Sequence, residues 1–484
     1  MKLWSEWHND CAQVGCEQAA ALPDYYPPIQ RVVRAEGQPC ITQVREQDGV
    51  VTVSGEIAMV LLYQTEDEKG LCSYRTVAPF SQTFSLPEGG AGACEARAGL
   101  GQVTCRISAP RRVAFKAQFP VYLTVSGEKP LHGPEPQADM LYHVKSVEGR
   151  CGAGCAARRF HLSEKGECDR MPAAALHSGA AVCVTEVSAA GGKTLVKGEL
   201  SVRTLFVTRD DQVGMVRYVF PVSQLLDLPC GEGIDVEAVF TVGQLETECG
   251  ESMDGSKGRF SYEIDLSVSA CAGENRTCEL VCDAFSTTHA IDCTRESTTF
   301  STPIERCRGS VDVTLSVPDD PEGGMLIDAS AALSAVDGKA DGRALQMEGE
   351  SALCLLYLED SGRIRARELT LPFTASIPCQ KQGRVAWQVC VWSVLPVADG
   401  VRLTLRYEAT IWRDTVCEHL CTATPDISRP LPPYTRYPVT VYFADKGELL
   451  WDIAKKYRIS PARIRECNGL EGEEITQARR LLIL

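Results

Sequence analysis

The chain has 484 residues, 44% of them hydrophobic and 23% charged; this composition excludes wholesale disorder, and the length suggests three or four domains of about 150 residues. The formal net charge of −15 argues against nucleic acid as a partner, because an acidic surface repels phosphate groups. The absence of any run of about 18 apolar residues argues against a membrane span.

The N-terminal segment, residues 1–28, begins with a mostly polar stretch. It lacks the apolar core of about 7–15 residues that a secretory signal needs. We therefore expect a cytoplasmic protein in a reducing compartment. There, the 23 cysteines are expected to be small, mostly buried apolar side chains and not a disulfide framework, and their odd number agrees with this.

Three stretches of the sequence resemble one another. Each contains a Gly-Glu pair, an aromatic residue eight positions after the glycine, and further on adjacent Pro and Phe followed by a second Pro. The glycines are Gly55, Gly198 and Gly349, and the aromatic residues are Tyr63, Phe206 and Tyr357. The glycines are 143 and 151 residues apart. Landmarks that keep their order and near-constant spacing predict three copies of one module.

The repeated stretches have the two-residue periodicity of β-strands. In the first, Val51 and Val53, and then Ile57, Met59 and Leu61, alternate with other residues. Long helical periodicity is missing between residues 30 and 425. We predict three related antiparallel β-sandwich or barrel-like modules, at residues 29–145, 170–295 and 300–423. The glycine of each Gly-Glu pair is expected at a bulge or at a close approach of two backbones.

The chain changes character near residue 425. Residues 424–437 are rich in proline and predict a stiff linker. Residues 438–484 then predict a small βααβ module. A short alternating strand precedes a first helix whose apolar face holds Leu450, Ile453, Ala454 and Tyr457. A second helix begins at Ser460-Pro461, buries Ile464 and Cys467, and ends at Asn468-Gly469, before a last strand at 481–484.

This C-terminal module resembles a LysM domain. Residues 447–457, GELLWDIAKKY, are similar to the family's signature G-D-T-L-W-D-I-A-K-K-Y, and the stretch from Asn468 to Leu470 matches its Asn-x-Leu. LysM domains bind N-acetylglucosamine polymers in a shallow groove between two loops. The resemblance assigns these residues to that groove: Gly447, Glu448, Leu449, Leu450, Asn468, Gly469 and Leu470. Leu449 replaces the usual Thr and removes a hydroxyl that could bond a sugar, which favours a protein partner over a glycan.

The whole architecture is similar to a family of clostridial spore-coat morphogenetic proteins with SPOCS-domain repeats and a C-terminal LysM domain (SipL-like proteins). Asp283-Ala284-Phe285-Ser286 resembles the Asp-Ala-Tyr-Ser segment of that family. The resemblance implies a mostly β fold with a small α+β module, and a location in the mother-cell cytoplasm at the forespore surface. It also implies a non-enzymatic scaffold in spore coat assembly whose LysM module docks on the coat's basement-layer ATPase.

Catalytic motifs are present only as fragments. Gly192-Lys193-Thr194 resembles the end of a P-loop, but Val187 stands where its first glycine would be, so a hairpin turn is the favoured interpretation. Three cysteine pairs have three intervening residues: Cys151/Cys155, Cys278/Cys282 and Cys417/Cys421. On a strand such pairs share a face, so paired burial is the favoured interpretation and a zinc site the alternative. We expect no catalytic residue, metal or cofactor.

Two other functions remain as alternatives. The LysM-like module could bind peptidoglycan or another chitin-type glycan of the cell wall, which would require export. An enzyme carried by the β modules is the other alternative, and no residue constellation supports it. Trp451 has two interpretations as well: a core residue of the LysM-like module, which is favoured, or a platform for a ligand.

Overall fold

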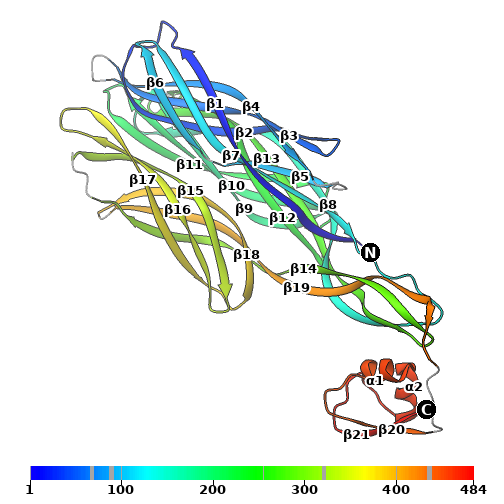
Figure 1. The fold of residues 1–484 in the computed structure, drawn as a ribbon. Helices are drawn as coiled ribbons and strands as arrows, with labels where there is room; N and C mark the ends of the chain where they lie inside the picture. The colour runs from blue at the N-terminus through cyan, green and yellow to red at the C-terminus, as the bar shows by residue number, and fades with distance from the viewer. Residues whose placement is uncertain are drawn as a thin grey trace.

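The computed structural model describes residues 2–65, 70–86, 92–99, 101–253, 255–318, 323–398, 400–432 and 439–484. Antiparallel strands dominate this part of the chain, and its two helices lie in the C-terminal module (Figure 1). The predicted mostly β fold with a small α+β module is confirmed. Neither of the helices found in these ranges has the length and the hydropathy needed to cross a membrane.

The strands before the C-terminal module form three successive units. The first contains β1 (Lys2–Ala21), β2 (Ile29–Gln47), β3 (Val50–Thr65), β4 (Leu71–Ser85), β5 (Ala93–Ala98), β6 (Gln102–Ala109) and β7 (Arg112–Pro130). The second contains β8 (Met140–Cys168), β9 (Pro172–Ala190), β10 (Lys193–Thr208), β11 (Val213–Leu226), β12 (Ile234–Glu251) and β13 (Gly258–Ser286). The third contains β14 (His289–Ser316), β15 (Met325–Asp341), β16 (Ala344–Leu358), β17 (Ile364–Pro378), β18 (Gln382–Val397) and β19 (Gly400–Pro430).

Each unit combines two sets of strands in the same order. In each unit the last strand lies between the first strand and a strand that shortly precedes it in the chain. The resulting orders are β1-β7-β5, β8-β13-β12 and β14-β19-β18. The intervening strands form the meanders β2-β3-β4, β9-β10-β11 and β15-β16-β17. In the first unit β6 also pairs with β7. In the third, residues 339–341 pair with residues 382–384 and join both sets into one six-stranded sheet.

The two sets of strands face each other across an apolar core. In the first unit Phe80 of β4 meets Phe119 of β7 edge to face, with ring centroids 4.9 Å apart. In the second unit Phe206 of β10 meets Phe260 of β13 at 5.2 Å. Every second residue of these strands points inward, which is why the sequence shows a two-residue period. We call the units the first, second and third sandwiches.

The glycine of each Gly-Glu pair lies where two backbones approach closely. The neighbouring strands β2, β9 and β15 shift register at this point, as a bulge does. A Cβ atom would lie 2.3 Å from a carbonyl oxygen at Gly55, 2.5 Å at Gly198 and 3.3 Å at Gly349. The predicted bulge or close approach is confirmed, and it explains why a residue without a side chain stands at each position.

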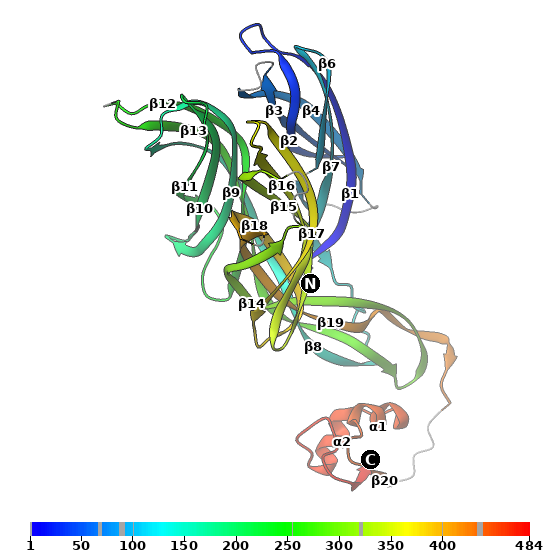
Figure 2. The same ribbon diagram turned by 90° about the vertical axis from the view of Figure 1, so that its left-hand side faces the viewer.

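The three sandwiches meet at one apolar cluster. Leu62, Leu205 and Leu356 each follow their glycine by seven residues, and all three are buried in this cluster. Its other buried members are Leu71, Leu176 and Ile364. Figure 2 shows the three sandwiches gathered side by side above the C-terminal module. Each sandwich contributes a leucine at the same distance along the strand from its Gly-Glu pair. The cluster therefore sets the positions of the three sandwiches relative to one another.

Buried charges lie beside this cluster. The residues opposite the three leucines are Arg34, His177 and Asp328. Asp328 is 4% exposed and pairs with Arg203 and, at 4.0 Å, with Nη1 of Arg34. Arg34 belongs to the first sandwich, Arg203 to the second and Asp328 to the third, so one carboxylate links all three. Burial lowers the pKa of Arg34, and that of Arg203 to about 10.

The boundaries of the sandwiches differ from the predicted ones. β1 pairs with β7 from Lys2 opposite Pro130 to Ala21 opposite Arg112, so residues 1–28 contain a strand of the first sandwich. The second and third sandwiches begin with β8 and β14, before the predicted starts at residues 170 and 300. The reason is that the repeated motifs mark the meanders, whereas the first strand of each unit pairs with a strand far along the chain.

The second and third sandwiches extend into two ribbons that pack on each other. One ribbon is formed by residues 140–150 and 274–286, the other by residues 289–299 and 415–430, and we call them together the stalk (Figure 1). Apolar clusters around Cys278 with Phe300, and around Met140 with Leu420, lie between the ribbons. Residues 424–430, predicted as linker, therefore belong to β19. Residues 433–438 lie outside the described residues.

One pair of cysteines departs from the sequence-based expectation. Cys155 of β8 and Cys271 of β13 lie directly opposite each other and form a disulfide, with 4.2 Å between their Cα atoms. The other 21 cysteines form no disulfide. Residues paired across antiparallel strands have Cβ atoms within about 5.5 Å, which brings two thiols within reach. The expectation of free thiols is wrong for this pair. Its members are 116 residues apart, and the local pattern that contains Cys155 pairs it with Cys151 and not with Cys271.

Candidate functional site

The C-terminal module has the predicted order βααβ. It contains β20 (Thr440–Ala444), α1 (Leu450–Tyr457), α2 (Pro461–Asn468) and β21 (Arg479–Ile483). β20 and β21 pair antiparallel, from Thr440 opposite Ile483 to Ala444 opposite Arg479. The helices pack on the sheet through a buried cluster that includes Ile453, Ile464 and Leu481. The module therefore has a core of its own.

The sequence accounts for both helices. Leu450, Ile453 and Ala454 are buried along one face of α1. Ser460 precedes α2, Pro461 opens it, and Gly469 follows it with a φ of 60°, a conformation that favours glycine. Cys467, predicted on the buried face, is exposed. The helix has eight residues, and Ile464 is the residue that it buries, so the expected second contact does not form.

The first predicted groove loop is tied to residues 473–475. The backbone N–H of Gly447 donates to the carbonyl oxygen of Ile475 at 2.8 Å. In turn, the N–H of Ile475 donates to the carbonyl oxygen of Glu448 at 2.9 Å. Leu449 and Glu474 form a β-bridge beside these bonds. Residues 473–475 could not be predicted as part of this site, because they carry no motif and reach the loop only when the chain after α2 folds back.

Asn468 has a structural role at the end of α2. Its side-chain amide donates to the carbonyl oxygens of Ile464 at 2.8 Å and Leu482 at 2.7 Å. Its side-chain oxygen accepts from the N–H of Leu482 at 2.6 Å. These bonds tie α2 to β21 and use the polar groups of the side chain. Gly469 beside it is exposed, and Leu470 is half-buried against the core.

The remaining groove residues divide into exposed and supporting ones. Gly447 is exposed, and Leu449 is 37% exposed. Leu450 is 1% exposed and belongs to the core, so it supports the loop from inside and cannot offer a contact surface. Glu448 is half-buried and accepts from the Tyr442 hydroxyl at 3.0 Å, a hydrogen bond that raises the pKa of Tyr442. Leu449 is therefore the exposed apolar side chain of this loop.

Helix α1 also contacts the stalk. Nε1 of Trp451 donates to Oδ2 of Asp283 at 2.8 Å, and Nζ of Lys455 donates to both carboxylate oxygens of Asp283, at 2.9 and 2.6 Å. The Trp451 ring packs against Phe285 and His143, with centroids 5.0 and 5.1 Å away. Asp283 and Phe285 belong to the segment that the family resemblance singled out. We call this contact between α1 and the stalk the latch.

The latch keeps Asp283 ionised. Burial by itself would raise the pKa of Asp283, but the hydrogen bonds from Lys455 and Trp451 outweigh burial and hold this pKa below its ordinary value. Arg295 adds a positive charge 3.6 Å away. Trp451 is 7% exposed, which agrees with its interpretation as a core residue and shows that its polar edge meets the stalk.

Three of the four paired cysteines of the stalk lie in apolar surroundings, and the fourth, Cys421, contacts the Glu296 carboxylate. Cys278, Cys282 and Cys417 share a cluster with Val147 and Phe300, and the sulfurs of Cys282 and Cys417 are 3.9 Å apart. Burial raises the pKa of Cys278 and of Cys282, which favours the neutral thiol over the thiolate that a metal binds. Across the ranges that the structure describes, no group of three or more His, Cys, Asp or Glu side chains has a geometry suited to a metal ion.

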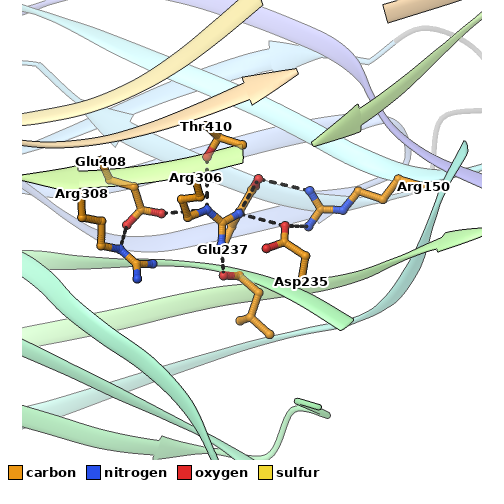
Figure 3. Close-up of polar contacts among 8 residues, drawn as sticks. Arg150, Asp235, Glu237, Arg306, Arg308, Glu408 and Thr410 are labelled. Atoms are coloured by element: carbon orange, nitrogen blue, oxygen red, sulfur yellow. Dashed lines mark hydrogen bonds and ion pairs between the residues drawn. The ribbon is translucent and has the colours of Figure 1, made fainter. Parts of the chain in front are cut away.

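An ion network joins the second and third sandwiches (Figure 3). Three guanidinium groups face three carboxylates in it: Arg150, Arg306 and Arg308, and Asp235, Glu237 and Glu408. Nη2 of Arg306, at the centre, lies 2.9 Å from Asp235 and 3.1 Å from Glu237. Its Nε lies 3.2 Å from Glu408. The charges balance within the network, so its role is to hold the two sandwiches together.

A cavity of about 650 Å³ lies beside this network. Two ion pairs lie within its lining: Arg406 with Glu199 and Arg308 with Glu408, both at 2.6 Å. Arg97, also in the lining, pairs with Glu95 at 2.8 Å. Burial raises the pKa of Cys390 in the lining to about 12, so this thiol stays neutral. The sulfur of Cys183, also in the lining, accepts a hydrogen bond from Nη1 of Arg406 at 3.2 Å.

Two domain families match the chain. The SipL, SPOCS domain family matches residues 28–108, in the first sandwich, and the LysM domain family matches residues 445–476. Neither the comparison with curated proteins nor that with solved structures gives a match. Both matching families are non-catalytic binding domains. The chain therefore carries a SPOCS domain and a C-terminal LysM domain, a composition that fits a sporulation-related protein with a glycan- or protein-binding module.

Proposed function

We propose that the chain is a non-enzymatic scaffold in spore coat assembly that docks through its LysM module on a coat morphogenetic protein, the basement-layer ATPase. The observation that carries this proposal is the joint presence of a SPOCS domain and a LysM domain in one chain. The stalk and the latch support it, because they hold the LysM module at a distance from the sandwiches. The place of action that we propose is the mother-cell cytoplasm at the forespore surface.

We further propose that the three sandwiches are copies of one SPOCS-like module. Their common strand order supports this, as does the register of the Gly-Glu pairs. The glutamate lies opposite a proline of the next strand in each sandwich: Glu56 opposite Pro79, Glu199 opposite Pro221, and Glu350 opposite Pro372. The three copies pack around one shared apolar cluster.

A protein partner suits the groove better than a glycan does. Sugar recognition needs free hydrogen-bonding groups, yet the Asn468 amide and the Glu448 carboxylate are bonded within the module. Leu449 instead offers an exposed apolar contact. Binding of an N-acetylglucosamine-containing glycan is the second candidate function, and the match to the LysM family favours it.

The test compares the purified full chain with a chain lacking residues 438–484 for binding to the purified basement-layer ATPase. Loss of binding on truncation is the expected result. Leu449→Asp should weaken binding by about 1–3 kcal/mol if Leu449 is central to the contact. Met253→Asp, at an exposed apolar position outside the LysM module, is the control and should have no effect. Thermal protection by chitin oligomers, with undiminished ATPase binding by Leu449→Asp, would favour the glycan function.

A further inference from the structure

The outer face of the LysM sheet is apolar. Leu481 and Ile483 of β21 are buried against the helices, so Leu482 between them points to the other side, where it is 42% exposed. Val441 lies opposite Leu482 and is 47% exposed. Phe443, two residues further along β20, is 72% exposed. These side chains share one face of a two-stranded sheet.

The same face continues beyond the paired residues. Val439 and Leu484 follow the alternation of β20 and β21 outward, and they are 55% and 39% exposed. Arg480 lies opposite Phe443 and adds a guanidinium group to the face. No ion pair or side-chain hydrogen bond of Arg480 is found with the described residues, and none of the six residues of this face is acidic. We call Val439, Val441, Phe443, Arg480, Leu482 and Leu484 the sheet face.

The latch turns the sheet face away from the rest of the molecule. Trp451 and Lys455 bind the stalk through α1, and α1 packs on the inner side of the sheet. Figure 1 shows α1 and α2 on the side of the module nearer the stalk, with β20 and β21 on the far side. An apolar surface that a protein holds outward in this way is typical of an interaction site.

We propose that the sheet face is a docking surface for a partner protein whose own contact surface is apolar and carries a carboxylate opposite Arg480. This inference rests on the proposed function, because the partner it concerns is the protein that the LysM module docks on. It adds a second surface to the groove loops, on another side of the module. The unpaired guanidinium at the edge of an apolar patch supplies the charge complementarity that selects an acidic group.

A second copy of the chain suits the sheet face less well. Two stacked copies would bring two arginine side chains into an apolar contact that contains no carboxylate, and burying an unpaired charge is unfavourable. Five apolar side chains also cover only a few hundred Å², below the roughly 800 Å² per partner of a standard interface. A different protein that also contacts the groove loops can reach that area.

The experiment uses full-length variants Phe443→Glu and Arg480→Glu, with Ile427→Glu as the control. Ile427 is 81% exposed on the stalk, outside the LysM module. Binding to the purified basement-layer ATPase is titrated for each variant, and sedimentation reports the mass of the chain alone. In addition, hydrogen–deuterium exchange of the unmodified chain is measured with and without the ATPase, so the result does not depend on how well the variants fold.

We expect Phe443→Glu and Arg480→Glu each to weaken binding about tenfold or more, Ile427→Glu to leave it unchanged, and the ATPase to protect β20 and β21. Unchanged binding by both variants without such protection would overturn the docking surface and leave the proposed function intact. Absence of binding by the unmodified chain would overturn both. A concentration-dependent dimer that Phe443→Glu dissolves would replace the partner protein by a second copy.

Discussion

The sandwiches and the LysM module are held in place in different ways. The sandwiches meet through a buried apolar cluster and through buried charges, of which Asp328 contacts two arginines from two other strands. The LysM module meets the stalk through one helix, with Asp283 accepting from Trp451 and Lys455. Each sandwich thus has its own apolar core and shares a further buried cluster with the other two. The LysM module instead meets the stalk through one helix, and Phe285 of the stalk packs into its core.

The two regions also differ in charge. Residues 438–484 carry a net charge of +1, so the rest of the chain carries −16. An acidic body with a nearly neutral end module repels other acidic surfaces everywhere except at that end. The difference agrees with the proposed function, in which the LysM module and not the acidic remainder of the chain meets the partner.

The largest expected effect is a loss of stability where the three sandwiches meet. Asp328→Ala leaves Arg203 buried without its carboxylate and removes one of the carboxylates near Arg34, another being Glu36. Breaking a buried ion pair in this way costs about 3–5 kcal/mol. Denaturant unfolding of the full chain should show this loss, whereas Asp210→Ala at an exposed position should show almost none. Equal stabilities of the two variants would mean that the three sandwiches do not depend on one another.

The three repeated glycines give a graded test within the body. Substitution by alanine places a methyl group 2.3 Å from a carbonyl oxygen at Gly55, 2.5 Å at Gly198 and 3.3 Å at Gly349. We expect destabilisation by about 1–3 kcal/mol, in the order Gly55, Gly198, Gly349. Gly15→Ala, where a Cβ meets no atom within 4 Å, is the control. A reversed order would show that the bulges relax and that the glycines are not steric requirements.

Local sequence patterns predicted much of this structure. The alternation of Val51, Val53 and Ile57 predicted strands with one buried face, and the LysM motif predicted two helices, with Gly469 at the end of the second. Both signals depend on residues within one or two turns or strands. The triplication itself stays a prediction, which superposition of three experimentally determined sandwiches would test.

Other features could not be predicted, because they join residues that are distant in sequence. The pairing of β1 with β7, the Cys155–Cys271 disulfide and the ion pairs of Asp328 each need a fold before the partners meet. The latch is the instructive case. The family resemblance pointed to Asp283 and Phe285, but only the structure shows that they receive Trp451 of the LysM module.

A smaller loss of stability is expected when the contact between α1 and the stalk, the latch, is weakened. Asp283→Asn keeps an oxygen that can accept from Trp451 but removes the charge that Lys455 pairs with. A hydrogen bond to a charged group contributes about 1.5–3 kcal/mol to stability. Because the Lys455–Asp283 ion pair is partly exposed, we expect the substitution to weaken the latch by about 1.5 kcal/mol or less. Hydrogen exchange of α1 should increase, while β20 and β21 keep their protection. Unchanged exchange in α1 would show that the apolar contact with Phe285 suffices to hold the module.

The smallest effect is a pH dependence of the latch. The pKa of Asp283 lies below its ordinary value of about 3.9 because Lys455 and Trp451 stabilise the carboxylate. A carboxyl group with a lowered pKa contributes its stabilisation fully above the unfolded value, and this contribution is lost as the pH falls through the folded value. The latch should therefore persist from neutral pH down to about pH 4 and weaken below it. Chemical-shift titration of the indole N–H of Trp451 reports this directly, with Asp283→Asn as the variant that lacks the transition. A transition that Asp283→Asn retains would instead show that the contact does not depend on the Asp283 carboxylate.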